Sequence, residues 1–175
     1  MANLLMGTGF YFLIPTLPVF IVDVMGAGPE KVGYIIAVYT LSALIIRPLT
    51  GYLLDGYGRK WIYLGAFFLF AAMLGFYTIA ITFVWLMVLR FIHGFTWGAA
   101  TTSSSTIVVD VVPANRRGEG IGIYGLSFTL AMAIGPGIAL VVLGDGNYNR
   151  MFLSSMAIAF AGLLLVLLVK FPAYE

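Results

Sequence analysis

Long apolar runs alternate with short polar connections along the whole chain of 175 residues. A helix that crosses the hydrocarbon core of a bilayer, about 30 Å thick, needs roughly 20 mainly apolar residues. Six runs have this length, and most charged residues lie between the runs rather than inside them. We therefore predict six membrane-spanning helices, near residues 4–24, 32–54, 61–81, 84–108, 120–143 and 151–171.

The composition of the chain supports a membrane protein over a soluble one. Hydrophobic residues make up 62% of the chain and charged residues 9%, whereas soluble domains have about 45–50% apolar and about 25% charged residues. The connections are too short for a soluble domain, so we predict an all-α, polytopic membrane protein, with residues 1–175 forming a single six-helix bundle.

The charge and cysteine content exclude several kinds of partner and site. A net charge of +2 without a run of one sign makes nucleic acid an improbable partner. The chain has no cysteine, which rules out disulfides and thiolate metal sites within it. We expect no cofactor and no metal.

Basic residues lie mainly in the connections on one side of the predicted membrane. Because cytoplasmic loops are enriched in Lys and Arg, the pattern predicts a cytoplasmic amino terminus in an integral membrane protein, which we expect in a bacterial inner membrane. The inner side would receive Arg59, Lys60, Arg116 and Arg117, with Arg47 and Lys170 near inner helix ends, and the outer side Lys31 and Arg150.

The stretch GYLLDGYGRK at residues 51–60 concentrates charges and glycines between the second and third spans. Taken alone, it can be a hairpin turn with basic anchors. It also closely resembles the G-x-L-x-D-x-x-G-R-K signature of the major facilitator superfamily. The matching residues are Gly51, Leu53, Asp55, Gly58, Arg59 and Lys60, while Leu54 and Gly56 depart from the usual small residue and base.

Further motifs of that superfamily follow in the expected order. GFYFLIPTLP in the first span, RFIHGFTWGAA in the fourth and DVVPANRRG after it are similar to family motifs, with His93 in the usual glutamine position. The fifth span partly matches the antiporter motif, but alanine or leucine replaces three glycines. The residues that carry these matches are Gly9, Pro15, Pro18, Arg90, Asp110, Pro113, Arg117, Gly118, Gly122, Gly135 and Pro136; the replaced positions are Ala131, Ala139 and Leu140.

The resemblance implies an amino-terminal half of a transporter, built as two inverted three-helix repeats. It implies transport of a small solute by alternating access, with proton-coupled efflux suggested by the partial antiporter motif. A second six-helix half, either a carboxy-terminal half or a second copy, would complete the pathway. The close start at Met1 and the end just after the sixth span lead us to expect a truncated sequence.

Arg90 is the main candidate for transport chemistry. It lies about 8 residues into the fourth span, about 12 Å deep at 1.5 Å per residue. A base at this depth is costly and usually faces the bundle interior or a water-filled cavity. Arg90 could attract an anionic substrate or stabilise a proton-carrying carboxylate, the role that the family resemblance implies. The alternative is a contact that only holds helices together, and a transport role requires access to an aqueous cavity.

Other side chains could contribute to the same cavity. His93 and Trp97 follow Arg90 at spacings of three and seven residues and share its face. Each has a packing alternative: a helix–helix hydrogen bond for the histidine and a filled space for the tryptophan. The remaining candidates are Tyr11, Tyr34, Tyr39 and Tyr124, and Asp23, which could instead be a solvated helix end.

Two further interpretations concern conformational change and competing functions. The resemblance implies a cluster of Asp55, Arg59 and Asp110 that latches the cytoplasmic side; the alternative is three independent surface charges. An intramembrane enzyme is not expected, because the chain has one histidine and cannot form H-E-x-x-H, and GLSF around Ser127 lacks the second glycine of a nucleophile elbow. A non-transporting six-helix bundle remains an alternative.

Overall fold

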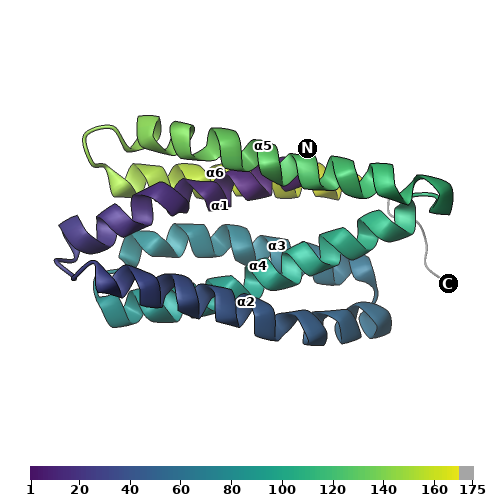
Figure 1. Cartoon of the computed structure of the whole chain (residues 1–175), viewed down its shortest axis with the longest axis horizontal. Helices are drawn as coiled ribbons and strands as arrows, with labels where there is room; N and C mark the ends of the chain where they lie inside the picture. Colours follow the sequence, from purple (N-terminus) through teal and green to yellow (C-terminus); the bar gives the residue numbers. More distant parts are fainter. Residues whose placement is uncertain (170–175) are drawn as a thin grey trace.

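The computed structural model describes residues 1–169 and is all-α, with no strand among these residues, which confirms the predicted fold class (Figure 1). Six helices are long and apolar enough to cross a membrane. They are α1 (Ala2–Val19), continued by a π-helical turn (Phe20–Val24), α2 (Glu30–Tyr57), α3 (Arg59–Phe76), continued by a 3₁₀ turn (Tyr77–Ile79), α4 (Phe83–Val111), α5 (Arg117–Leu143), preceded by a 3₁₀ turn (Ala114–Arg116), and α6 (Tyr148–Leu167).

Several helices extend beyond the predicted ranges. α2 has 28 residues and α4 has 29, so each is about 42–44 Å long at 1.5 Å per residue. This length exceeds a hydrocarbon core of about 30 Å. The helix ends, which include polar residues such as Glu30 and Asp110, can therefore extend beyond the hydrocarbon core. The last described helix ends at Leu167, while residues 170 and 171 of the predicted sixth span lie outside the described residues.

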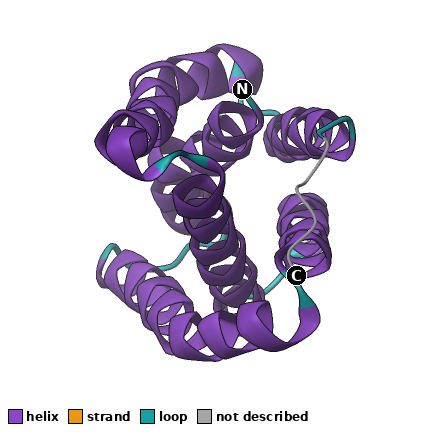
Figure 2. Cartoon of the chain, turned by 90° about the vertical axis from the view of Figure 1, so that its right-hand side faces the viewer, coloured by secondary structure: helices purple, strands orange, loops and turns teal. Residues whose placement is uncertain are grey.

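The packing pattern shows the two predicted inverted repeats. α1 packs mainly against α5 and α6, α4 packs mainly against α2 and α3, and α3 contacts α6. Exchanging α1 with α4, α2 with α5 and α3 with α6 leaves these main contacts unchanged. In the end-on view of Figure 2, α1 and α4 occupy the middle, with α2 and α5 on one side and α3 and α6 on the other.

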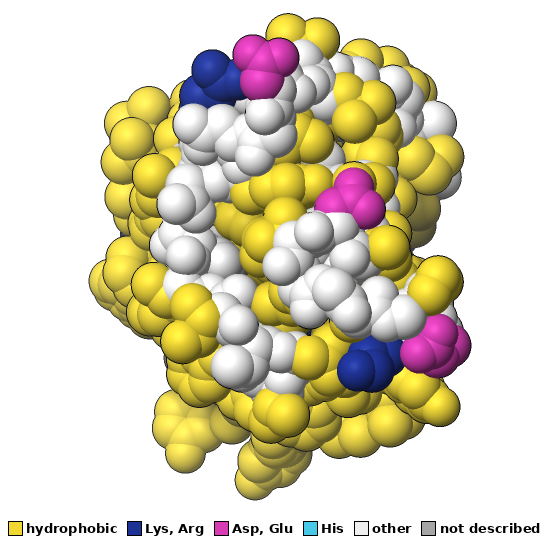
Figure 3. Space-filling model, turned by 90° about the vertical axis from the view of Figure 1, so that its left-hand side faces the viewer, with side chains coloured by type: hydrophobic (Ala, Val, Ile, Leu, Met, Phe, Trp, Pro, Cys, Tyr) yellow, Lys and Arg dark blue, Asp and Glu magenta, His cyan; other side chains and the backbone are white. Residues whose placement is uncertain are grey.

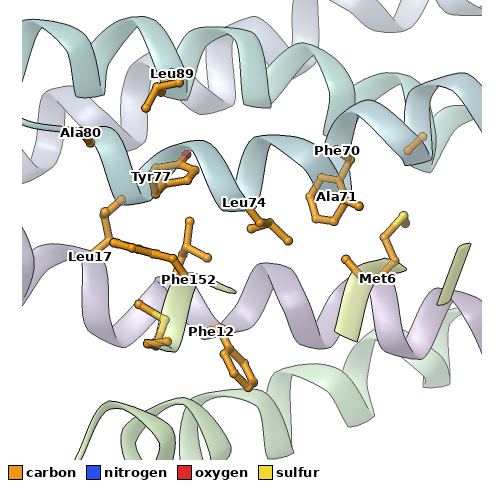
Figure 4. Packing of buried hydrophobic residues seen from close by; sticks show 14 of the residues in the cluster. Met6, Phe12, Leu17, Phe70, Ala71, Leu74, Tyr77, Ala80, Leu89 and Phe152 are labelled. Atoms are coloured by element: carbon orange, nitrogen blue, oxygen red, sulfur yellow. The ribbon is translucent and has the colours of Figure 1, made fainter. Parts of the chain in front are cut away.

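The largest buried side chains lie where α1, α3, α4 and α6 meet (Figure 4). Leu17 of α1, Leu74 of α3 and Phe152 of α6 are fully or almost fully buried, together with Tyr77 after α3. By contrast, α2 and α5 are the least buried of the six helices and expose many apolar side chains. The core is therefore on the α3–α6 side of the molecule, and α2 and α5 remain available to lipid or protein.

Glycines of α4 allow its close approach to α2. A Cβ atom built on Gly98 would lie 2.5 Å from the carbonyl oxygen of Ala43 and from Cγ2 of Ile46. One built on Gly94 would overlap Ser42 and the backbone of Tyr39. Since helices in a membrane associate through packing rather than through exclusion of water, small residues at such contacts are decisive.

The predicted proline-rich end of α1 is irregular. Pro15 and Pro18 lie inside α1, and the helix becomes π-helical from Phe20 onward. Proline cannot donate a backbone hydrogen bond, and π-helical turns often occur where the regular ladder is interrupted. Asp23 lies in this turn and is exposed.

Replacing Gly98 by alanine should destabilise the bundle by about 1–3 kcal/mol, because the added methyl group has no space against α2. Gly65→Ala is the matched control: a Cβ there meets no atom within 4 Å, and alanine is the better helix former by about 0.5–1 kcal/mol. Thermal unfolding in detergent measures both. Equal behaviour of the two variants would contradict the close α2–α4 contact.

Candidate functional site

The side chain of Arg90 lies in the contact between α2, α3 and α4 and is only 4% exposed. Its guanidinium carbon is 4.8 Å from the ring centroid of Tyr39 in α2 and 5.7 Å from that of Tyr77. Cations over aromatic faces at such distances are stabilised by the ring quadrupole. The aromatic contacts thus join three helices around one buried charge.

His93, one turn after Arg90, belongs to the same cluster and is fully buried. Its Nδ1 is 2.9 Å from the Tyr77 hydroxyl, and its ring is 4.9 Å from that of Phe70 and 5.6 Å from that of Tyr39. The positive charge of Arg90 beside Tyr77 favours the arrangement in which this hydroxyl donates to Nδ1 and Nε2 carries the imidazole proton. The structure thus contains the predicted helix–helix hydrogen bond.

Polar atoms of this cluster are buried without partners among the described residues. They are Nε and Nη1 of Arg90, Nε2 of His93 and the hydroxyl of Tyr39. Within residues 1–169 no carboxylate lies within 4 Å of Arg90. An unsatisfied buried polar group costs about 1–3 kcal/mol, and a charged one more. The cluster therefore contains buried donors and acceptors that form no hydrogen bond within the described residues.

The enclosure of Arg90 bears on its predicted role. In this conformation protein covers the residue almost completely, with 4% of its surface exposed. Contact with a solute would require Tyr39 or its neighbours to move. In the conformation described, Arg90 is a residue that holds α2, α3 and α4 together, as the packing alternative requires, and it does so through aromatic rings.

Trp97 continues the aromatic layer toward the other repeat. Its ring is stacked on Phe10 of α1 at 4.4 Å and lies 5.3 Å from Phe70 of α3 and 5.8 Å from Phe128 of α5. It therefore contacts three helices besides its own, as the packing alternative for this residue requires. Tyr11 lies nearby: a Cβ on Gly135 of α5 would be 2.8 Å from its Cβ.

Tyr124 of α5 is joined to the hydroxyl-rich part of α4. Its hydroxyl is 2.9 Å from Oγ of Ser104 and donates to the carbonyl oxygen of Thr101 at 3.2 Å. Most hydroxyls of residues 101–106 bond to carbonyl groups of their own helix. Tyr34, by contrast, is 60% exposed on α2 and does not join the Arg90 cluster.

The predicted latch residues meet at one end of the bundle. Arg59 at the start of α3 forms an ion pair with Asp110 near the end of α4, and both side chains are 23% exposed. Asp55 is 4.0 Å from Arg59 and its side chain is 80% exposed, so it is the weaker partner. Lys60 lies over the ring of Trp61. The structure therefore brings the predicted three charges together, dominated by the pair between α3 and α4.

Glycine 58 fixes the geometry of the latch. It is the only residue between α2 and α3, and its φ of +86° is in the region that side chains strongly disfavour. Gly51, Gly122 and Pro136 occupy the predicted motif positions in α2 and α5, where Gly51 and Gly122 have open space beside them.

Sequence analysis did not identify Tyr77 and assigned no functional role to Arg47. Tyr77 lay near the predicted outer end of the third span, where no periodicity indicates a contact with α4. Arg47 was predicted near an inner helix end, but it lies 10 residues before the end of α2 at Tyr57, and it is exposed. At 1.5 Å per residue this is about 15 Å from the helix end.

A family model for the Major Facilitator Superfamily matches residues 1–174. The chain belongs to this superfamily. Quinolone resistance protein NorA of Staphylococcus aureus is 29% identical over 130 residues, covering 74% of this chain and 33% of NorA. Multidrug resistance protein 3 of Bacillus subtilis is 27% identical over 138 residues, covering 79% of this chain and 27% of that protein. The match spans about a third or less of the length of these relatives.

Replacing Tyr39 by phenylalanine should leave the fold unchanged or stabilise it by about 1 kcal/mol, because a buried hydroxyl without a partner is removed. Tyr63→Phe is the matched control: this buried hydroxyl donates to Oδ1 of Asn3 at 3.0 Å, so its loss should cost about 1 kcal/mol. Unfolding in detergent compares them. Strong destabilisation by Tyr39→Phe alone would show that the fold uses this hydroxyl.

Proposed function

We propose that this chain is the amino-terminal six-helix half of a transporter that moves small organic compounds out of the cell by alternating access, coupled to protons. Membership of the superfamily supports transport across a membrane. The names of the relatives, which refer to quinolone and multidrug resistance, support export of drug-like compounds. The partial antiporter motif at Gly122, Gly135 and Pro136 supports proton coupling.

The ion pair between Arg59 and Asp110 carries this proposal. Arg59 belongs to the first inverted repeat and Asp110 to the second, so the pair joins the two repeats of this bundle at one end. Partly exposed ion pairs are worth little individually, about 0–1 kcal/mol. Such a pair can therefore break and reform during a transport cycle.

A second six-helix bundle is part of the proposal, as a carboxy-terminal half or a second copy. α2 and α5, the least buried helices, lie on the same side of the molecule (Figure 2). A solute pathway between two bundles would be bordered by this side, which includes the edges of α1 and α4.

We further propose that the amino terminus and the latch lie in the cytoplasm. Arg59, Lys60, Arg116 and Arg117 are at the latch end of the bundle, while the opposite end, shown in Figure 3, has few and scattered charged side chains. The positive-inside rule favours this orientation in a bacterial inner membrane.

The enclosed position of Arg90 favours one alternative, a six-helix bundle that does not transport. In that case the buried cluster would serve assembly alone. Transport assays on variants of the latch and of Arg90 separate the two functions, because only a transporter depends on charges that change partners.

Reversing one charge of the latch should reduce transport at least tenfold, and reversing both should restore a substantial part. Arg59→Asp places two acids together, whereas Arg59→Asp with Asp110→Arg re-forms an ion pair with opposite polarity. Efflux of a fluorescent cationic dye from cells, at matched membrane expression, measures this. Wild-type efflux in the single variants would exclude the latch from the mechanism.

Arg90→Ala should abolish proton-driven transport but leave exchange of labelled for unlabelled solute, because exchange needs the conformational change without net proton movement. Arg90→Lys, which keeps the charge but loses the planar contact with Tyr39, should retain part of both activities. Proteoliposomes with and without a pH gradient provide the readout. Loss of exchange together with loss of stability would indicate a purely structural role.

A further inference from the structure

Arg47 lies within the membrane-spanning part of α2 and has no described partner. It is 17 residues after Glu30 and 10 residues before Tyr57, the two ends of the helix. Its side chain is exposed, and among residues 1–169 no ion pair or hydrogen bond involves it. Arg90 is enclosed by aromatic rings, whereas Arg47 extends from the surface of the bundle.

Lipid is an unfavourable environment for this guanidinium. An arginine at the centre of a spanning helix costs about 2.5–3.5 kcal/mol by insertion scales, and arginines within spans usually face water or protein. The surface around Arg47 is therefore expected to differ in character from a lipid-facing surface.

The exposed surface of α2 divides into two stripes of different character. Gly33, Thr40, Arg47 and Gly51 follow at spacings of seven, seven and four residues and share one face, which also carries Leu44, 64% exposed. No atom lies within 4 Å of a Cβ built on either glycine. The second stripe carries large apolar side chains typical of lipid contact: Tyr34, Leu41, Ile45, Leu49 and Tyr52.

α2 and α5 lie on the same side of the molecule (Figure 2). In α5, the Tyr124 hydroxyl is hydrogen-bonded to Ser104 of α4. Tyr124 lies seven residues after the start of α5 and Ser104 seven residues before the end of α4. Both are therefore about 10 Å from the cytoplasmic helix ends, about one helical turn closer to them than Arg47 at about 15 Å. Three helices thus place polar groups within about one turn of each other in depth.

We propose that Arg47 lines the aqueous pathway between the two bundles and binds a carboxylate there, supplied by the solute or by the second half. This inference rests on the proposed transport function. A guanidinium presents paired donors that match the two oxygens of a carboxylate, and the open space beside Gly51, one turn after Arg47, leaves room for such a group. The hydroxyl of Tyr124 offers a polar group about one helical turn closer to the cytoplasmic helix ends.

Accessibility of the stripe to water is the first test. This chain has no cysteine, so Thr40→Cys introduces a single thiol once any cysteines elsewhere in the natural protein are replaced. A membrane-impermeant methanethiosulfonate should label Thr40→Cys at least tenfold faster than Ile45→Cys on the bulky stripe. Asn115→Cys and Asn149→Cys, in exposed positions at opposite ends, serve as standards for the two aqueous sides and also report the orientation.

The ligand is tested with 2-naphthoate and its neutral analogue 2-naphthamide in membrane vesicles. If the solute supplies the carboxylate, naphthoate should slow labelling of Thr40→Cys severalfold, naphthamide should not, and Arg47→Gln should abolish the protection. If the second half supplies it, neither compound protects, Arg47→Asp abolishes transport, and an acid-to-arginine change in that half restores it.

Two results would overturn the proposal. Thr40→Cys labelled no faster than Ile45→Cys would place Arg47 in lipid or at the interface. If Thr40→Cys is labelled rapidly but Arg47 variants alter neither protection nor transport, Arg47 does not bind a carboxylate. Labelling and protection are read without transport, so a failure of the proposed transport function would be recognised separately.

Discussion

The contact between α2 and α4 around Arg90 is the constraint on which the arrangement depends. A guanidinium inside a spanning bundle needs compensation, and here the faces of Tyr39 and Tyr77 provide it. The Tyr39 ring can approach the charge because Gly94 and Gly98 remove the side chains that would separate α2 and α4. Small residues and the buried charge thus act together in the contact between α2 and α4. His93 links this contact to the end of α3 through its hydrogen bond with Tyr77.

The two arginines within the spans represent opposite solutions to the same cost. Arg90 is covered by protein and keeps donors without partners in the interior, whereas Arg47 remains exposed on α2. The bilayer tolerates the first because aromatic faces replace water and the second only where water or another protein surface replaces lipid.

The inverted repeats connect this interior to the latch. α4 contacts α2 and α3 of the other repeat along its length, so the end that carries Asp110 is mechanically linked to the part that carries Arg90. The single residue Gly58 between α2 and α3 keeps Arg59 close to that end. A displacement of α4 relative to the first repeat would therefore affect both the ion pair and the aromatic contacts.

The sequence by itself determined the six spans, the all-α class and the superfamily motifs, because hydrophobic length and turn chemistry are local properties. The meeting of Asp55, Arg59 and Asp110 could be anticipated, since they lie at helix ends whose side of the membrane follows from counting spans. Only the tertiary structure decided that Arg90 is enclosed, that Tyr77 is its neighbour and that Arg47 is exposed on α2. In spans that are apolar all round, periodicity does not distinguish lipid from protein as the neighbour. The face that each side chain meets is set by how six helices pack together.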